Sequence, residues 1–159
     1  MAINPYWARW CKASCAKHFN DLKQGNNFHV EGEDRQSDSW ESWLEFRFDG
    51  PYYRGLWGGE FRLYVEINVL CVQIENNNAY SMEDLTGVVA SAFTNSIGLF
   101  KLGPSSDPEN DSSQFGCLTL DTTSKKDAIV VSNFGKIRPD TELMQSSVEG
   151  HYYTELQGV

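Results

Sequence analysis

Apolar and polar side chains alternate most regularly between residues 61 and 71. One face of this run is entirely apolar, consisting of Phe61, Leu63, Val65, Ile67, Val69 and Cys71. A period of two is typical of a half-buried β-strand. Residues 40–48 alternate in the same way, with Leu44 and Phe46 on the apolar side and Trp43 on the other. We therefore predict a long antiparallel hairpin whose two strands are joined by an irregular, Gly/Pro-rich connection at 49–59.

The amino-terminal segment has a helical rather than a strand period. From Trp7 to Leu22 the apolar residues recur three or four positions apart. Asn4 precedes them as an N-cap candidate, and Pro5 suits a first helical position because its missing N–H costs nothing there. We expect this helix to end at Gly25.

A second helix is predicted from Met82 to about Ser96, with Gly98 as its terminator and Ser81 and Asp84 as a weak capping box. Alternation returns in the last third of the chain and predicts three more strands, at 115–121, 128–133 and 148–156. The predicted order is α-β-β-α-β-β-β. It indicates an α+β fold, in which a mainly antiparallel sheet has two helices packed on one face.

Length and local composition indicate how the chain is organised. With 159 residues the chain is expected to form a single domain, 1–159. Segments 25–38 and 103–114 are polar and poor in apolar residues, so we predict long loops or arms there.

The net charge of −9 disfavours a protein that binds nucleic acid phosphates, because such proteins carry a basic patch. The sequence contains no long apolar run, and its amino terminus lacks the pattern of a secretion signal. We therefore expect a product of the cytoplasm that has no membrane partner.

Charge is segregated along the chain. The first thirty residues have a net charge of +3, and the exposed side of the first helix is basic through Arg9, Lys12 and Lys17. Residues 31–49 have a net charge of −5. Their acidic side chains are Glu31, Glu33, Asp34, Asp38, Glu41, Glu45 and Asp49.

Candidate chemistry is sparse. Cys11, Cys15 and His18 are spaced to share one side of the first helix, as metal ligands could, but the two cysteines coincide with the apolar stripe. Buried, reduced thiols are the favoured interpretation. The sequence contains no nucleophile motif and no glycine-rich phosphate loop. We expect no catalytic set, no metal site and no cofactor.

Aromatic residues gather around the predicted hairpin. Trp43 points away from the apolar face, so it is a candidate for contact with a partner. Tyr52, Tyr53 and Trp57 in the connection are further interface candidates.

The order of elements over nearly the whole chain resembles that of the tail terminator proteins of long-tailed bacteriophages. The resemblance is carried by the helix at 7–22, the hairpin around 40–48 and 61–71, the helix at 82–96 and the closing Tyr152-Tyr153-Thr154-Glu155-Leu156.

The resemblance implies a structural virion protein, found in the tail or neck and made in the host bacterial cytoplasm. It implies a ring, usually of six subunits, that ends tail tube polymerisation and joins the tail to the head. The implied partners are further copies of the chain, the tail tube protein and the head-to-tail connector protein. DNA would pass through without specific binding, along a lumen whose acidic wall repels phosphates. Residues 31–49 are the candidate wall.

Three alternatives remain open. Another neck, head-completion or minor tail protein would have the same sequence features. A small-molecule binding protein or enzyme would bring Trp40, Trp57, Tyr52 or Tyr64 together around a concave cavity with a His or Asp at its base. An acidic DNA mimic would carry carboxylates at phosphate spacing along one face.

Overall fold

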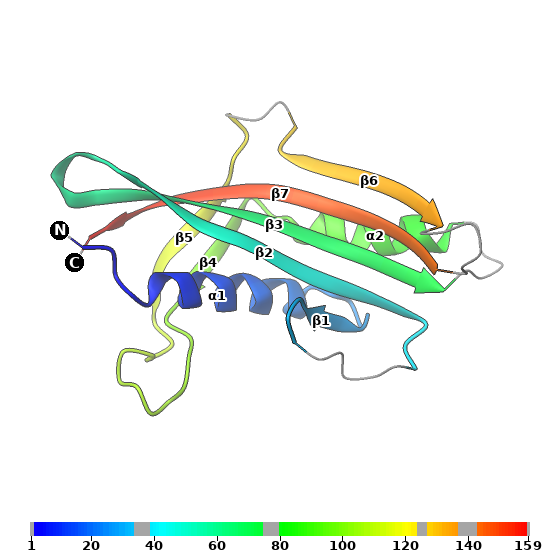
Figure 1. The fold of residues 1–159 in the computed structure, drawn as a ribbon, viewed down its shortest axis with the longest axis horizontal. Coiled ribbons are helices and arrows are strands. Elements are labelled where there is room, and N and C mark those ends of the chain that lie inside the picture. The colour runs from blue at the N-terminus through cyan, green and yellow to red at the C-terminus, as the bar shows by residue number, and fades with distance from the viewer. Residues whose placement is uncertain (1, 34–38, 75–79, 124–126, 137–142, 159) are drawn as a thin grey trace.

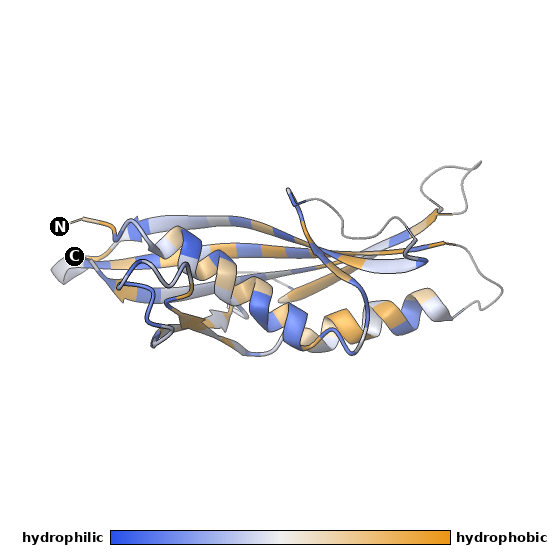
Figure 2. Ribbon diagram, turned by 90° about the horizontal axis from the view of Figure 1, so that it is seen from below, coloured by the Kyte–Doolittle hydropathy of each residue, from blue (hydrophilic) through white to orange (hydrophobic). Residues whose placement is uncertain are grey.

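The computed structural model describes residues 2–33, 39–74, 80–123, 127–136 and 143–158. It is α+β, with a curled and mostly antiparallel sheet covered on one face by two helices (Figures 1 and 2). The helices are α1 (Trp7–Asp21) and α2 (Ser81–Ala92), and η1 (Trp57–Gly59) is a short 3-10 turn. The strands are β1 (Phe28–Val30), β2 (Ser42–Gly55), β3 (Glu60–Ile74), β4 (Ser96–Phe100), β5 (Gln114–Leu120), β6 (Ile129–Lys136) and β7 (Leu143–Gln157).

The sheet is organised around β3 and β7, the two longest strands. Its order is β1-β2-β3-β7-β5-β4, and β6 also pairs with β7. The two strands β6 and β5 share the same edge of β7, because β6 pairs with its first half and β5 pairs with Tyr152 and Tyr153 further along. Of the strand pairs in the described part of the chain, only β1–β2 is parallel. Within the described residues, β6 thus forms an edge of the sheet.

The core lies between the sheet and the helices, as the alternation predicts. The residues of β3 from Leu63 to Cys71 that face the helices are buried, and so are Leu44 and Phe46 of β2. Trp10 and Phe19 of α1 pack against them from the other layer. The side chains of β2, β3 and β7 that point the other way form the uncovered face of the sheet.

The predicted hairpin is confirmed, but its connection is shorter than expected. Strand β2 does not break at Asp49 and instead runs on to Gly55. A register shift between Asp49 and Tyr52 absorbs the Gly50–Pro51 pair, whose peptide bond is cis. Gly50 has a φ of 109°, which other residues rarely adopt, and Pro51 has no N–H to donate to the sheet. A bulge accommodates both residues without ending the strand.

The second helix ends earlier than predicted, and Gly98 lies in β4 instead of terminating it. Buried Phe93 follows α2 and packs on Phe19, and the Tyr152 hydroxyl donates a hydrogen bond to the Thr94 carbonyl at 2.7 Å. These tertiary contacts turn the chain into β4. The expected capping box does not form, since the Ser81 hydroxyl bonds Gln73.

The first helix begins two residues after Pro5, and Asn4 caps the preceding turn by accepting a hydrogen bond from the Tyr6 N–H at 2.9 Å. The segment 25–38, predicted as a loop, contains β1. The loop 103–114 is anchored to α1 by Asn110, which is only 8% exposed. Its side-chain Oδ1 accepts hydrogen bonds from Trp10 and Arg9.

Candidate functional site

The candidate site lies on the uncovered face of the sheet, where β3 and β7 place polar side chains next to one another. Glu66 pairs with His151 across the two strands, and Asn68 pairs with Glu149. The intervening residues Ile67 and Gly150, which pair with each other, are buried under the helices. Because side chains alternate between faces, burying the apolar residues brings the polar ones together on the outside.

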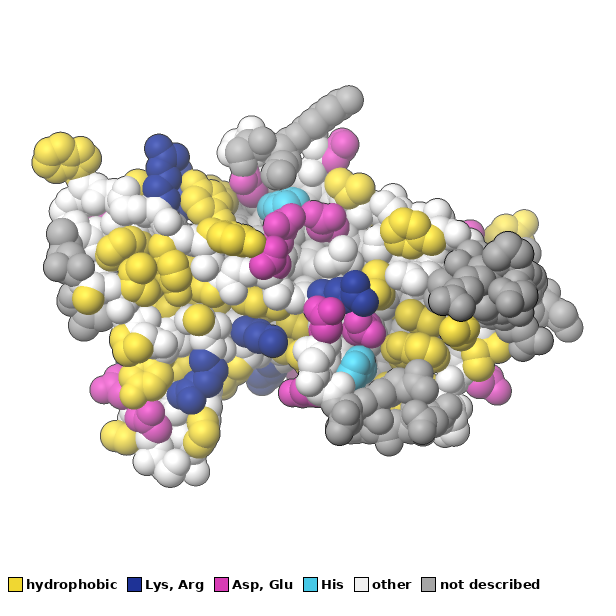
Figure 3. All heavy atoms as spheres, in the orientation of Figure 1, with side chains coloured by type: hydrophobic (Ala, Val, Ile, Leu, Met, Phe, Trp, Pro, Cys, Tyr) yellow, Lys and Arg dark blue, Asp and Glu magenta, His cyan; other side chains and the backbone are white. Residues whose placement is uncertain are grey.

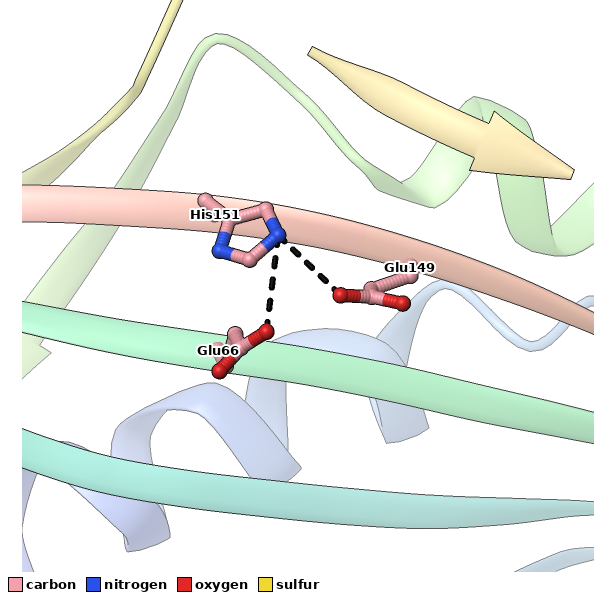
Figure 4. A group of neighbouring side chains, drawn as sticks. All are labelled: Glu66, Glu149 and His151. Atoms are coloured by element: carbon pink, nitrogen blue, oxygen red, sulfur yellow. Dashed lines mark ion pairs between the residues drawn. The ribbon is translucent and has the colours of Figure 1, made fainter. Parts of the chain in front are cut away.

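Glu66, Glu149 and His151 form a compact cluster (Figure 4). The His151 Nε2 atom lies 3.1 Å from Glu149 Oε1 and 3.5 Å from Glu66 Oε1. One donor atom from each residue lies within 4.8 Å of the other two. The imidazole is 19% exposed and each carboxylate 38%, so the cluster is half-buried yet open to solvent. A single imidazole edge therefore faces two carboxylates.

Within the cluster, the surroundings of Glu66 raise the pKa of its carboxyl. Burial raises the pKa of this carboxyl, and a hydrogen bond shared with Glu149 raises it further. The charges of Glu149 and Asp49 act in the same direction, while His151 lowers the pKa of Glu66. The cluster therefore contains more negative charge than His151 alone can balance.

A hollow of about 420 Å³ extends from the cluster toward β2 and β1. It is lined by Glu31, Arg47, Phe48, Asp49, Glu66, Asn68 and Glu149. Among the described residues of this lining Arg47 is the one cation, and its guanidinium lies 2.8 Å from Glu45 and 3.6 Å from Glu31. Acidic side chains and a histidine gather on this part of the face in Figure 3. Hence the middle of the uncovered face is strongly acidic.

Asn68 adds an unusual polar atom to this hollow. Its Oδ1 is shielded from solvent and has no hydrogen-bond partner among the described residues. Buried amide oxygens are normally hydrogen-bonded, because leaving one without a partner costs free energy. A bound group could therefore supply the missing donor only if the Asn68 side chain moved to expose this oxygen.

A second, smaller hollow of about 130 Å³ lies on the other side of the cluster. Tyr52, Tyr64, Asp121 and His151 line it, together with Glu66. The Tyr52 hydroxyl donates a hydrogen bond to Asp49 at 2.6 Å. This hollow therefore brings together a histidine, an aspartate and two of the tyrosines that were expected in a small-molecule site. The volume, however, is below the roughly 300–1,000 Å³ of typical ligand pockets.

The aromatic interface candidates are dispersed in the structure. Trp43 points to the uncovered face, as predicted from alternation. Tyr52 is 51% exposed, and Trp57 at the hairpin tip is 97% exposed. Tyr53 lies on the helix-covered face and stacks on Trp7. Two of the four are thus well exposed to solvent.

The basic candidates lie along the exposed side of α1. Lys12 is exposed, Lys17 pairs with Asp21 one turn later, and Arg9 bonds Asn110. Part of the predicted basic surface is therefore neutralised within the chain.

The acidic candidates divide into two groups. Glu45 and Asp49 lie on the uncovered face of β2. Glu31, Glu33 and Glu41 are exposed in the segments beside it. Asp34 and Asp38 fall outside the described residues.

The four cysteines are free. Cys11, Cys15 and Cys71 are buried, and Cys117 is exposed. Burial raises the pKa of Cys11 to about 12. His18 instead contacts the Ala92 carbonyl through Nε2 at 2.8 Å. Cys11, Cys15 and His18 form no ligand cluster in the described part of the chain, and the buried-thiol interpretation fits their positions.

Sequence reasoning missed the cluster of Glu66, Glu149 and His151. Glu66 stood on the polar face of the predicted strand 61–71, and His151 lay in the predicted strand 148–156. Only the pairing of β3 with β7 brings the three together across more than eighty residues of chain. An available clue was the spacing of Glu149 and His151, which places both on one face of a strand.

Comparison with known proteins does not assign a family. A scan against protein-family models gave no match. A search of curated proteins also found no significantly similar sequence. Among the described residues, neither helix has the length and apolar character required to cross a membrane.

Proposed function

We propose that the protein is a structural component that works by self-association, as a ring of the tail terminator type at the head-proximal end of a phage tail. The observation that carries this proposal is the edge strand β6. Val130, Val131 and Phe134 on this strand are 42%, 47% and 57% exposed. Within the described residues, β6 pairs only with β7. A long edge strand with exposed apolar side chains is a favourable surface for association.

The acidic middle of the uncovered face supports the same proposal. The candidate lumen residue Asp49 pairs with Glu66 on this face, and Glu45 lies four residues before Asp49 on the same face. If neighbouring subunits meet edge to edge, this face lines the ring and the helices lie outside. DNA phosphates then pass along a wall that repels them.

The exposed hairpin tip supplies a second contact surface in this proposal. Trp57 lies in η1 at the end of the β2–β3 hairpin, and Figure 1 shows this end of the hairpin beside the two chain termini. We assign it to the contact with the tail tube or the head connector, because exposed tryptophan is enriched in protein interfaces. A head-completion or minor tail protein could use the same surfaces. The position of the ring in an imaged particle distinguishes these proteins from a tail terminator.

The test is the oligomeric state of the purified chain. Size-exclusion chromatography with light scattering should give a closed oligomer, about six times the chain mass of 18.0 kDa. Phe134→Lys and Val131→Lys should shift this species to monomer, because a buried lysine at the edge is costly. The matched control is Leu22→Lys at the C-cap of α1, where the exposed fraction is 38% and assembly should persist.

Two results would refute the proposal. One is a monomer at every concentration that never associates with phage tails. The other is an oligomer that resists both β6 substitutions, which would remove β6 from the interface.

A further inference from the structure

We propose that Glu66, Glu149 and His151 form a binding site for a divalent transition-metal ion, with Mn²⁺ and Zn²⁺ as the ions best suited to it. The proposal goes beyond the self-association described above and does not depend on it. It is based on the convergence of one imidazole nitrogen and two carboxylate oxygens from neighbouring strands.

Two of the three distances between donor atoms in the cluster match those between ligands of one metal ion, and the two carboxylate oxygens lie within 4.8 Å of each other. Donor atoms that each lie about 2.0–2.2 Å from a metal are separated by roughly 3.0–3.6 Å in tetrahedral or octahedral geometry. His151 Nε2 is 3.1 Å from one carboxylate oxygen and 3.5 Å from the other. An ion can therefore bind between Nε2 and the two carboxylate oxygens with small side-chain movements.

The ligand types define the class of ion. Imidazole suits Zn²⁺ and related ions, while carboxylate oxygens suit Mn²⁺, so a site with both ligand types can take either ion. Mg²⁺ and Ca²⁺ prefer all-oxygen coordination, so His151 disfavours them. Three protein ligands leave one or more positions for water, and the half-exposed cluster gives those positions access to solvent.

Two features outside the three ligands fit a cation. The surrounding hollow contains Glu31 and Asp49 in addition to the two ligand carboxylates, and Arg47 is the one basic side chain among the described residues that line it. A divalent ion would reduce the repulsion among these carboxylates. Asn68 also lines the hollow, and its shielded Oδ1 has no partner among the described residues. A metal-bound water could donate the missing hydrogen bond to this atom after a movement of the Asn68 side chain that exposes it.

Metal binding would join the two central strands of the sheet. Glu66 lies on β3, while Glu149 and His151 lie on β7. An ion held by all three would oppose separation of these strands and stabilise the folded state.

The site can be tested on the full-length chain after treatment with a chelator. Mn²⁺ is titrated and followed by electron paramagnetic resonance, because it has little affinity for thiols. Zn²⁺ is titrated by calorimetry in a Cys117→Ser background, which removes the exposed thiol. We expect one saturable site per chain and a higher Tm at saturation.

Glu66→Gln, Glu149→Gln and His151→Ala should each weaken binding by at least the roughly 10–100-fold that loss of an outer-shell partner costs. The matched controls are Glu155→Gln, on the uncovered face of β7 but paired with Arg62, and His29→Ala on β1. Both should bind as the unsubstituted chain does. Circular dichroism establishes that each variant is folded, and the isosteric Glu→Gln changes keep the test valid if His151→Ala does not fold.

The proposal is wrong if neither ion shows saturable binding at millimolar concentration. It is also wrong if binding persists unchanged in the folded ligand variants, or if Glu155→Gln reduces binding as much as Glu66→Gln does. In the first case the cluster is an ion pair between His151 and its two carboxylates.

Discussion

Asn110→Ala should detach the loop 103–114 from the first helix and measurably destabilise the protein. In the folded chain the Asn110 Oδ1 atom accepts a hydrogen bond from the Trp10 indole at 2.8 Å and one from Arg9 at 3.0 Å. Trp10 is only 1% exposed, so its N–H has no access to solvent when Asn110 is removed. The substitution thus leaves a buried donor without an acceptor.

The magnitude follows mainly from that orphaned indole. A buried donor without a partner costs about 1–3 kcal/mol, and the partly exposed Arg9 bond adds little. We expect the free energy of unfolding to fall by about 2–3 kcal/mol, which corresponds to a Tm lower by roughly 4–12 °C for a chain of this size. Urea denaturation followed by circular dichroism measures the change, and limited proteolysis should show faster cleavage within 103–114.

Three variants make the reasoning refutable. Asn110→Asp keeps the acceptor and should cost less than Asn110→Ala. Glu109→Ala changes an exposed neighbour in the same loop and should lie within about 0.5 kcal/mol of the unsubstituted chain. In a Trp10→Phe background, which has no indole donor, Asn110→Ala should cost less. If Asn110→Ala matches Glu109→Ala, or costs as much in the Trp10→Phe background, the buried hydrogen bond is not the cause.

Three further outcomes are expected. Gly150→Ala should lower the free energy of unfolding by about 1–3 kcal/mol in urea denaturation, because its Cβ would lie 2.5 Å from the buried Phe93 ring. The control Gly87→Ala in α2 meets no atom and should be neutral or stabilising. A thiol reagent should modify Cys117 quickly in the native chain and the three other cysteines only on unfolding, so fast labelling of two or more thiols would contradict the buried positions. Stability should fall between about pH 8.5, where an unfolded thiol ionises, and about 12, the raised pKa of Cys11, because the folded state retains the proton that the unfolded state loses. Cys11→Ala should flatten that dependence in denaturation curves recorded across the range, and an unchanged slope would exclude this thiol as its source.

The hairpin shows how much of the fold a local sequence pattern can predict. The alternation around Leu44, Phe46 and Ile67 was sufficient to predict two strands and the face that each buries, because side-chain period is a property of the backbone alone. The Gly50–Pro51 pair was interpreted as a break. Strand β2 continues past Gly50–Pro51 because it pairs with β3 on both sides of these residues. The sequence alone does not show how much free energy this pairing contributes.

The same limit applies to the second helix and to the loop 103–114. Residues up to Ser96 fit a helical period, yet Phe93 and the Tyr152 hydroxyl hold the chain in another direction. The loop was predicted from its polarity, and its anchor at Asn110 depends on an indole a hundred residues earlier in the chain. Both outcomes depend on contacts between distant segments.

By itself, the sequence determined the α+β class, the two helices, the principal strands, the buried thiols and the acidic character of the segment 31–49. These features depend on the spacing of apolar residues, on composition and on short-range geometry, all of which can be read directly from the sequence. The tertiary structure alone decided that β7 pairs with β3 and is shared by β5 and β6, which places Glu66 beside His151 and leaves β6 at an edge. Strand register is fixed by the summed packing of a whole buried face, so the cluster and the exposed edge arise only when the complete core is assembled.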